Sequence, residues 1–140
     1  MSGDQREAEQ PKKTVEEVAR SVGRYQPEAY YFVFEALEYL LGRLDERRHV
    51  TGAELSLAIR DLALERFGLL ALPVLRTWGV TQTADFGRIV FALVQAGLMS
   101  KTDEDDVRDF QNVFDFDEAF AKYRVPAKMD TQAFPSDDAK

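Results

Sequence analysis

The amino-acid sequence predicts a mainly α-helical protein, a compact single-domain bundle of five to seven helices. Large apolar residues recur three and four positions apart through most of the chain, the spacing that gives a helix one apolar face. Threonine precedes several of these segments and glycine follows them, as expected at helix ends. The chain has 140 residues and is 45% hydrophobic, which suits one domain with a substantial core.

The helices are expected between residues 14 and 123. Residues 1–13 are polar and carry no apolar pattern, so they are predicted to form a disordered arm. Residues 124–140 contain two prolines and little periodicity, and we expect a flexible tail there. The domain boundaries therefore follow from composition rather than from a motif.

The first two helices have clear boundary signals. Thr14 is placed to cap a helix over residues 15–22 that Gly23 ends. Pro27 suits the first turn of a longer second helix, where its missing N–H group does no harm. Close packing against another helix would explain Gly42 within this second segment. Its apolar stripe consists of Tyr30, Val33, Phe34, Leu37, Leu40, Leu41 and Leu44.

The following segments are also helical in pattern. Thr51 and Glu54 match a capping box at the start of a helix over residues 51–68. Residues 69–79 form a shorter helical segment with Pro73 in its first turn.

The most regular pattern covers residues 83–97, with Thr83 as the expected cap and Gly97 as the end. Its apolar face is the strongest candidate for the centre of the core, because each large apolar side chain that is buried contributes about 1.5–3 kcal/mol before entropy. That face is formed by Phe86, Ile89, Val90, Leu93 and Val94.

The C-terminal segment allows two interpretations. In the first, Thr102 caps one helix, and Asp115 or Asp117 caps a last short one. In the second, residues 98–116 form a short β-hairpin in a winged-helix-like domain. The recognition helix of such a domain would offer Arg88 alone to DNA, so even this fold would favour a protein partner.

Negative charge is confined to one segment. Residues 103–118 hold eight acidic residues and one arginine, which accounts for the whole net charge of −7. An otherwise neutral body has no field to attract phosphate backbones, so nucleic acid is not an expected partner. The aromatic residues here are either core or an exposed surface for a protein with a basic face. The candidate partner-binding residues are Asp103, Asp105, Asp106, Asp109, Phe110, Phe114, Phe116 and Phe120.

His49 is the only histidine and lies in a charged stretch between two predicted helices. Cations at one helix end and a cap at the next helix start explain this stretch as a junction. Arg47, Arg48 and His49 then form a second candidate patch for a partner. Alternatively, His49 serves a small hydrolase or lyase, which requires a concave site around it. Glu46 has the spacing to His49 of a di-iron ligand pair, but such bundles need two histidines.

The sequence lacks the residues that several kinds of catalytic and metal-binding site require. The chain has no cysteine, which excludes disulfides, thiolate catalysis and cysteine-bound metals. No phosphate-binding glycine loop or calcium loop is present, so we expect no catalytic set, cofactor or metal. No apolar run reaches the ~20 residues of a membrane span and no leader segment is visible. We therefore expect a cytoplasmic protein with no membrane partner.

Five blocks occur in order along the chain: YYFVFEALEYLL, RRHVTGAEL, AIRDLALERFG, VLRTWGV and DFGRIVFALVQAGLMSKTDEDDVRDFQNVFDFDEAF. With these blocks, residues 24–123 resemble the family of uncharacterised bacterial proteins that is restricted to Planctomycetes and Verrucomicrobia. The resemblance implies a stand-alone bacterial domain in the cytoplasm. It implies no activity and assigns no functional residue.

The sequence thus predicts a non-enzymatic protein-interaction or regulatory domain that docks a partner through its acidic and aromatic C-terminal segment. A winged-helix-like, transcription-associated regulator that binds nucleic acid is one alternative. A small hydrolase or lyase that uses His49 is the other.

Overall fold

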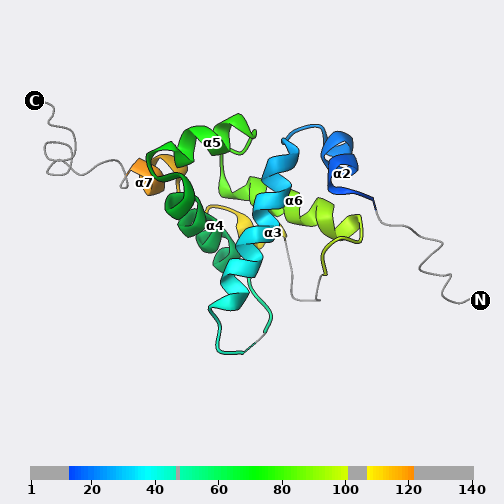
Figure 1. The fold of residues 1–140 in the computed structure, drawn as a ribbon, viewed down its shortest axis with the longest axis horizontal. Coiled ribbons are helices and arrows are strands. Elements are labelled where there is room, and N and C mark those ends of the chain that lie inside the picture. The colour runs from blue at the N-terminus through cyan, green and yellow to red at the C-terminus, as the bar shows by residue number, and fades with distance from the viewer. Residues whose placement is uncertain (1–12, 47, 101–106, 122–140) are drawn as a thin grey trace, which may run out of the picture.

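A computed structural model describes residues 13–46, 48–100 and 107–121, and within these ranges the fold is mainly α-helical, as predicted (Figure 1). The predicted arm, apart from Lys13, and the predicted tail lie outside the described residues. The elements are α2 (Val15–Val22), α3 (Pro27–Gly42), α4 (Gly52–Phe67), η1 (Gly68–Leu70), α5 (Ala71–Thr77), α6 (Thr83–Gln95), η2 (Val107–Phe110) and α7 (Phe116–Ala121), where η denotes a 3₁₀ helix.

The β-hairpin of the alternative fold does not occur in the described residues. Residues 98–100 and 107–116 contain no strand, and the second of these stretches begins with the 3₁₀ helix η2. Thr102, the expected cap of a helix here, lies outside the described residues. None of the described helices is both long enough and apolar enough to span a bilayer.

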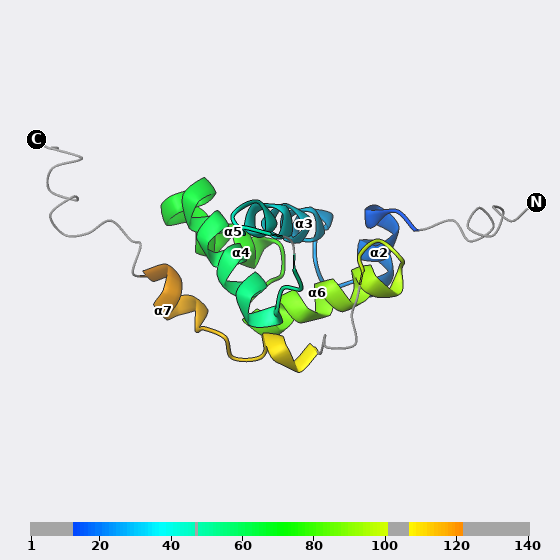
Figure 2. The ribbon, with the colours of Figure 1, turned by 90° about the horizontal axis from the view of Figure 1, so that it is seen from below.

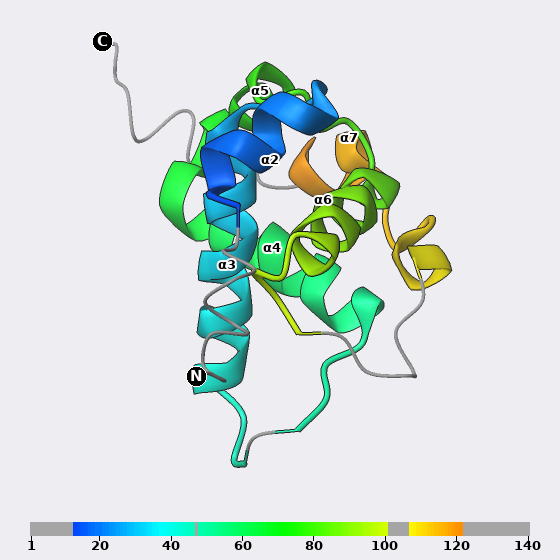
Figure 3. The ribbon, with the colours of Figure 1, turned by 90° about the vertical axis from the view of Figure 1, so that its right-hand side faces the viewer.

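The helices α3, α4 and α6 form the centre of the fold. α3 packs against α4, and α6 crosses behind α3 in the view of Figure 1 and beneath it in Figure 2. The short η2 lies against both α6 and α4, while α5 and α7 contact each other and α4. Figure 3 shows α3 on one side and η2, in yellow, on the other, with α6 and the start of α4 between them.

The core is built where these helices meet. Each central helix contributes large side chains that are almost fully buried, and α5 adds Leu75. On α6, the predicted core face is only partly correct. Val90 and Val94 are partly exposed, because the buried stripe runs along one edge of the predicted face. The buried side chains at the centre include Tyr30, Ile59, Leu75, Phe86, Ile89 and Leu93.

The predicted Thr14 cap of α2 and the predicted capping box of α4 are confirmed, and α2 has a capping box as well. The Thr14 hydroxyl accepts a hydrogen bond from the Glu17 N–H at 3.1 Å, and the Glu17 carboxylate accepts one from the Thr14 N–H at 2.8 Å. Thr51 and Glu54 form the same pair at 3.0 and 2.9 Å. Gly23 ends α2 in the left-handed conformation that glycine adopts at little cost.

Two local predictions are wrong. The cap of α6 is Gln82, and Thr83 is the first helical residue, whose hydroxyl accepts a hydrogen bond from the Val113 N–H at 3.1 Å. Gly42 ends α3 with no atom within 4 Å of the place where a Cβ would stand, so close packing does not explain it. By contrast, Asp115 precedes α7 as expected and accepts a hydrogen bond from the Glu118 N–H at 2.9 Å.

A buried carboxylate explains why Thr83 is not the cap. Asp85 accepts hydrogen bonds from the backbone N–H groups of Thr81 and Gln82 at 2.9 and 3.2 Å. It also accepts bonds from the Tyr25 hydroxyl at 2.5 Å and from Arg88 at 2.6 Å. Burial alone would raise the pKa of Asp85, but these donors together lower it. Asp85 therefore fixes the start of α6 and ties it to the segment between α2 and α3.

Candidate functional site

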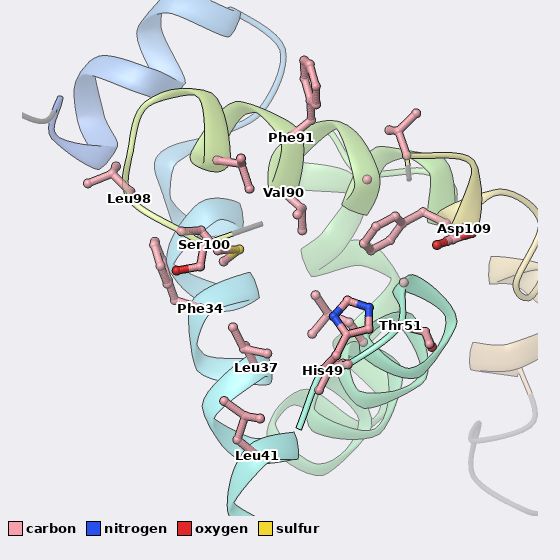
Figure 4. A pocket seen from close by; sticks show the side chains of 18 of the residues that line it. Phe34, Leu37, Leu41, His49, Thr51, Val90, Phe91, Leu98, Ser100 and Asp109 are labelled. Carbon is pink, nitrogen blue, oxygen red and sulfur yellow. The ribbon is translucent and has the colours of Figure 1, made fainter. Parts of the chain in front are cut away.

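A pocket of about 650 Å³ opens between α3, the start of α4, α6 and η2 (Figure 4). Its two long walls are apolar faces of α3 and α6. We call it the α3–α6 pocket. These walls are lined by Phe34, Leu37, Leu41, Val90, Phe91 and Val94.

The apolar walls follow from helical periodicity. On α3, Phe34, Leu37 and Leu41 are spaced by three and four residues, so their side chains share one face. On α6, Val90 points into the pocket and Phe91 projects outward at its rim. The Phe91 side chain is 51% exposed, which is high for a large aromatic residue. A continuous apolar surface thus remains in contact with water.

One end of the pocket depends on two glycines. A Cβ on Gly52 would stand 2.8 Å from the Phe110 ring and from the Asp109 Cβ, and a Cβ on Gly87 would stand 3.0 Å from Phe110. Real Cβ atoms essentially never show the shorter of these distances, and the longer one is tighter than most real contacts. These glycines therefore let η2 lie directly on α4 and α6, which closes this end of the pocket.

His49 lines the pocket from the segment before α4, and its imidazole points into the open space (Figure 4). The neighbouring Arg48 fixes the backbone of this segment. Its guanidinium donates two hydrogen bonds to the Glu54 carboxylate, at 3.1 and 2.9 Å, and one to the His49 carbonyl oxygen at 2.8 Å. Hydrogen bonds from Arg48 and from the Thr51 backbone lower the pKa of Glu54 to about 2. The Arg48–Glu54 ion pair and the Thr51 helix cap therefore hold the segment that places His49 in the pocket wall.

The polar groups around the pocket are few. Thr51 and Ser100 contribute hydroxyl groups, and Glu38 and Asp109 contribute carboxylates. The described residues contain no group of three or more metal-binding side chains. An apolar cavity of this size with a few polar groups has the form of a binding site.

The structure places the aromatic residues of the C-terminal segment in the core. The side chains of Phe110, Phe116 and Phe120 are buried, and Phe114 is partly buried against Phe116 and Phe86, with ring centroids 5.6 and 6.4 Å apart. Of the two interpretations of these rings, core therefore holds for Phe110, Phe116 and Phe120. Of these four aromatic residues, only Phe110 lines the pocket, where it forms part of the end wall.

The predicted acidic residues are only partly described. Asp109 is exposed and lines the pocket. Asp103, Asp105 and Asp106 lie outside the described residues, as does Arg47 of the second candidate patch. Arg48 and His49, the rest of that patch, both line the pocket. Two residues of the first patch, Asp109 and Phe110, therefore line the same pocket as Arg48 and His49 of the second.

Sequence analysis missed the α6 wall. Phe91 was the available signal, because it is a large apolar residue outside the predicted core face of an otherwise regular helix. The two glycines of the end wall gave a second signal, since glycine inside a helix costs stability unless another chain segment approaches closely.

Comparisons with known proteins give no match for this chain. No family model matches it. No curated protein matches it, and no solved structure does either. The function must therefore be argued from the α3–α6 pocket itself.

Proposed function

We propose that the chain is a non-enzymatic protein-interaction domain with a regulatory role, and that it binds an apolar segment of a partner in the α3–α6 pocket. The observation that supports this most is the pair of apolar walls that remain open to water, with Phe91 exposed at the rim. Apolar surface of this kind on a folded domain marks an interaction site more often than it marks a tolerated defect.

The carboxylates that line the pocket agree with a protein partner. Glu38 on α3 and Asp109 on η2 are both exposed. An apolar surface with carboxylates at its edge suits a partner whose apolar residues are flanked by basic ones.

The proposed function is tested by co-purification from the native cells with an affinity tag on the chain. Phe91→Ala removes an exposed apolar side chain at the pocket, and Leu70→Ala removes one on η1 away from it. We expect a protein that co-purifies with the wild type and with Leu70→Ala to be lost with Phe91→Ala. Recovery of the same proteins with all three chains would contradict the proposal.

The second candidate function is acid–base catalysis by His49. The observation in its favour is the position of the imidazole in the pocket, with hydroxyl and carboxylate groups lining the same space. A hydrolase would cleave activated esters, such as nitrophenyl esters of short acids, faster than buffer does, and His49→Ala would abolish the excess. Hydrolysis at the buffer rate by the wild-type chain would count against this candidate.

From the resemblance of residues 24–123 to the bacterial family, we also propose that the chain works in a bacterial cytoplasm. Fractionation of the native cells, followed by detection of the chain with an antibody, tests this location. Recovery of the chain in the membrane or periplasmic fraction would contradict it.

A further inference from the structure

We propose that the α3–α6 pocket binds an amphipathic helix of the partner, with apolar residues that enter the pocket and basic residues beside them. This inference specifies the partner of the function proposed above and therefore depends on that function. The main-chain groups of the walls, the length of the walls and the charges at the rim each support it.

The walls offer a bound peptide few main-chain hydrogen bonds. α3 and α6 are regular helices, whose N–H and C=O groups are paired within each helix. The described residues include no strand edge to which an extended peptide could add a strand. A helix satisfies its own main-chain groups, so it can cover an apolar pocket without leaving them unpaired.

The length of the walls matches two turns of helix. On α3 the lining residues run from Phe34 to Leu41, and on α6 they run from Gly87 to Val94. Each run covers eight residues, and the seven steps between its ends span about 10 Å at 1.5 Å per residue. The side chains at positions i, i+3 or i+4, and i+7 of a bound helix cover the same length. The pocket is therefore expected to take three apolar anchors from one helical face.

The charges at the rim favour basic residues on that helix. Glu38 stands on α3 and Asp109 on η2, both exposed and both lining the pocket. The charge of Arg48 is matched by its ion pair with Glu54 at 2.9 Å. A second copy of this chain would bring the same carboxylates and a further net charge of −7, so repulsion opposes self-association.

The experiment uses a synthetic peptide of about 15 residues, four helical turns, built from leucine and lysine with leucine at helical spacing. A leucine–glutamate peptide of the same pattern and a leucine–lysine peptide of scrambled pattern are the controls. Binding of labelled peptide to the full chain is measured by fluorescence anisotropy at low and at physiological salt. We expect saturable one-to-one binding of the leucine–lysine helix, weakened by salt, with both controls at least about tenfold weaker.

Matched variants locate the binding. Phe91→Ala removes an apolar group at the rim and should weaken binding about tenfold, whereas Leu70→Ala should leave it unchanged. Val90→Thr keeps the shape of a pocket-lining side chain, adds a hydroxyl, and should also weaken binding. Circular dichroism of each variant confirms that it is folded.

A second pair of variants tests the charges. The double variant Glu38→Gln with Asp109→Asn should weaken binding about threefold to tenfold at low salt. Its control, Glu28→Gln with Asp61→Asn, removes the same charge from positions that do not line the pocket and should have little effect.

Three outcomes would overturn the inference. The first is that the leucine–glutamate helix binds as tightly as the leucine–lysine helix. The second is that the Phe91→Ala and Leu70→Ala chains bind the leucine–lysine helix with the same affinity. The third is that the wild-type chain sediments as a dimer that Phe91→Ala dissociates. The co-purification experiment separates the two proposals. If a native partner is lost with Phe91→Ala but the leucine–lysine helix does not bind, the helical occupant is wrong and the interaction function stands.

Discussion

Replacement of Asp85 by asparagine should destabilise the fold far more than the removal of an exposed charge does. The carboxylate is 1% exposed and receives donors on both oxygens. One oxygen accepts from Tyr25 and Arg88, and the other accepts from the backbone N–H groups of Thr81 and Gln82. An asparagine side chain keeps one of these oxygens as an acceptor. Its NH₂ group replaces the other and faces the N–H or O–H donors that the lost oxygen accepted from.

The magnitude follows from the donors that lose their acceptor. Whichever way the amide of Asp85→Asn is turned, at least one donor is left facing an N–H group, and the charge that strengthens the remaining bonds is gone. Each buried donor without a partner costs about 1–3 kcal/mol, so we expect a loss of about 2–4 kcal/mol. For a domain of this size such a loss lowers the melting temperature by roughly 10 °C.

The assay is urea unfolding followed by far-ultraviolet circular dichroism at neutral pH. Asp61→Asn, at an exposed position, is the matched control and should stay within about 0.5 kcal/mol of the wild type. Tyr25→Phe should cost about 1 kcal/mol and should not add to Asp85→Asn in the double variant, because both remove the same hydrogen bond. Wild-type stability of the Asp85→Asn chain would refute the role assigned to this carboxylate.

Four further predictions concern stability. Leu93→Ala, which removes a fully buried side chain from α6, should cost about 2–5 kcal/mol in urea unfolding, and wild-type stability would contradict its place in the core. Tyr30→Phe should be neutral or stabilise the fold by about 1 kcal/mol, because the buried Tyr30 hydroxyl has no partner among the described residues; a clear loss would show that this hydroxyl does have a partner. Gly52→Ala should cost about 1–3 kcal/mol, because the added Cβ would meet Phe110 at 2.8 Å, whereas Gly42→Ala should not destabilise, and equal effects would refute the packing of η2. The folded-state pKa of Glu54 is about 2, below its ordinary value near 4.5, so the stability that its carboxylate adds is complete above pH 4.5 and is lost as pH falls toward 2. The stability of Glu54→Gln should therefore lack this loss between pH 4.5 and 2 in acid unfolding, and a pH profile equal to that of the wild type would contradict the ion pair with Arg48.

Local features of the fold were predictable from the sequence because their causes are local. Thr14 and Thr51 cap their helices through residues three positions away, so the pattern alone reveals them. Thr83 also precedes an apolar run, but Phe86 rather than a glutamate stands three positions after it, and Asp85 accepts the N–H groups of Thr81 and Gln82 and shifts the cap to Gln82. The hydrogen bond that Asp85 accepts from Tyr25, sixty positions away, is what periodicity cannot show.

The candidate site was predictable only in part. His49 was singled out because it is the only histidine, yet its place in a pocket depends on how α3, α6 and η2 pack around it. The aromatic residues of the C-terminal segment could be core or surface on spacing alone, and the contacts of η2 and α7 bury them. The role of a glycine is equally hard to predict from the sequence. Another segment packs closely against Gly52, whereas none lies near Gly42.

The most direct test of the central claim is a nuclear magnetic resonance titration of the isotopically labelled chain with the leucine–lysine helix. If the α3–α6 pocket is the interaction surface, the largest shift changes will be at Leu37, His49, Val90 and Phe91, and the signals of Leu69 and Leu70 on η1 will stay in place. Changes centred on η1, or spread evenly over residues that do not line the pocket, would show that the chain meets its partners elsewhere.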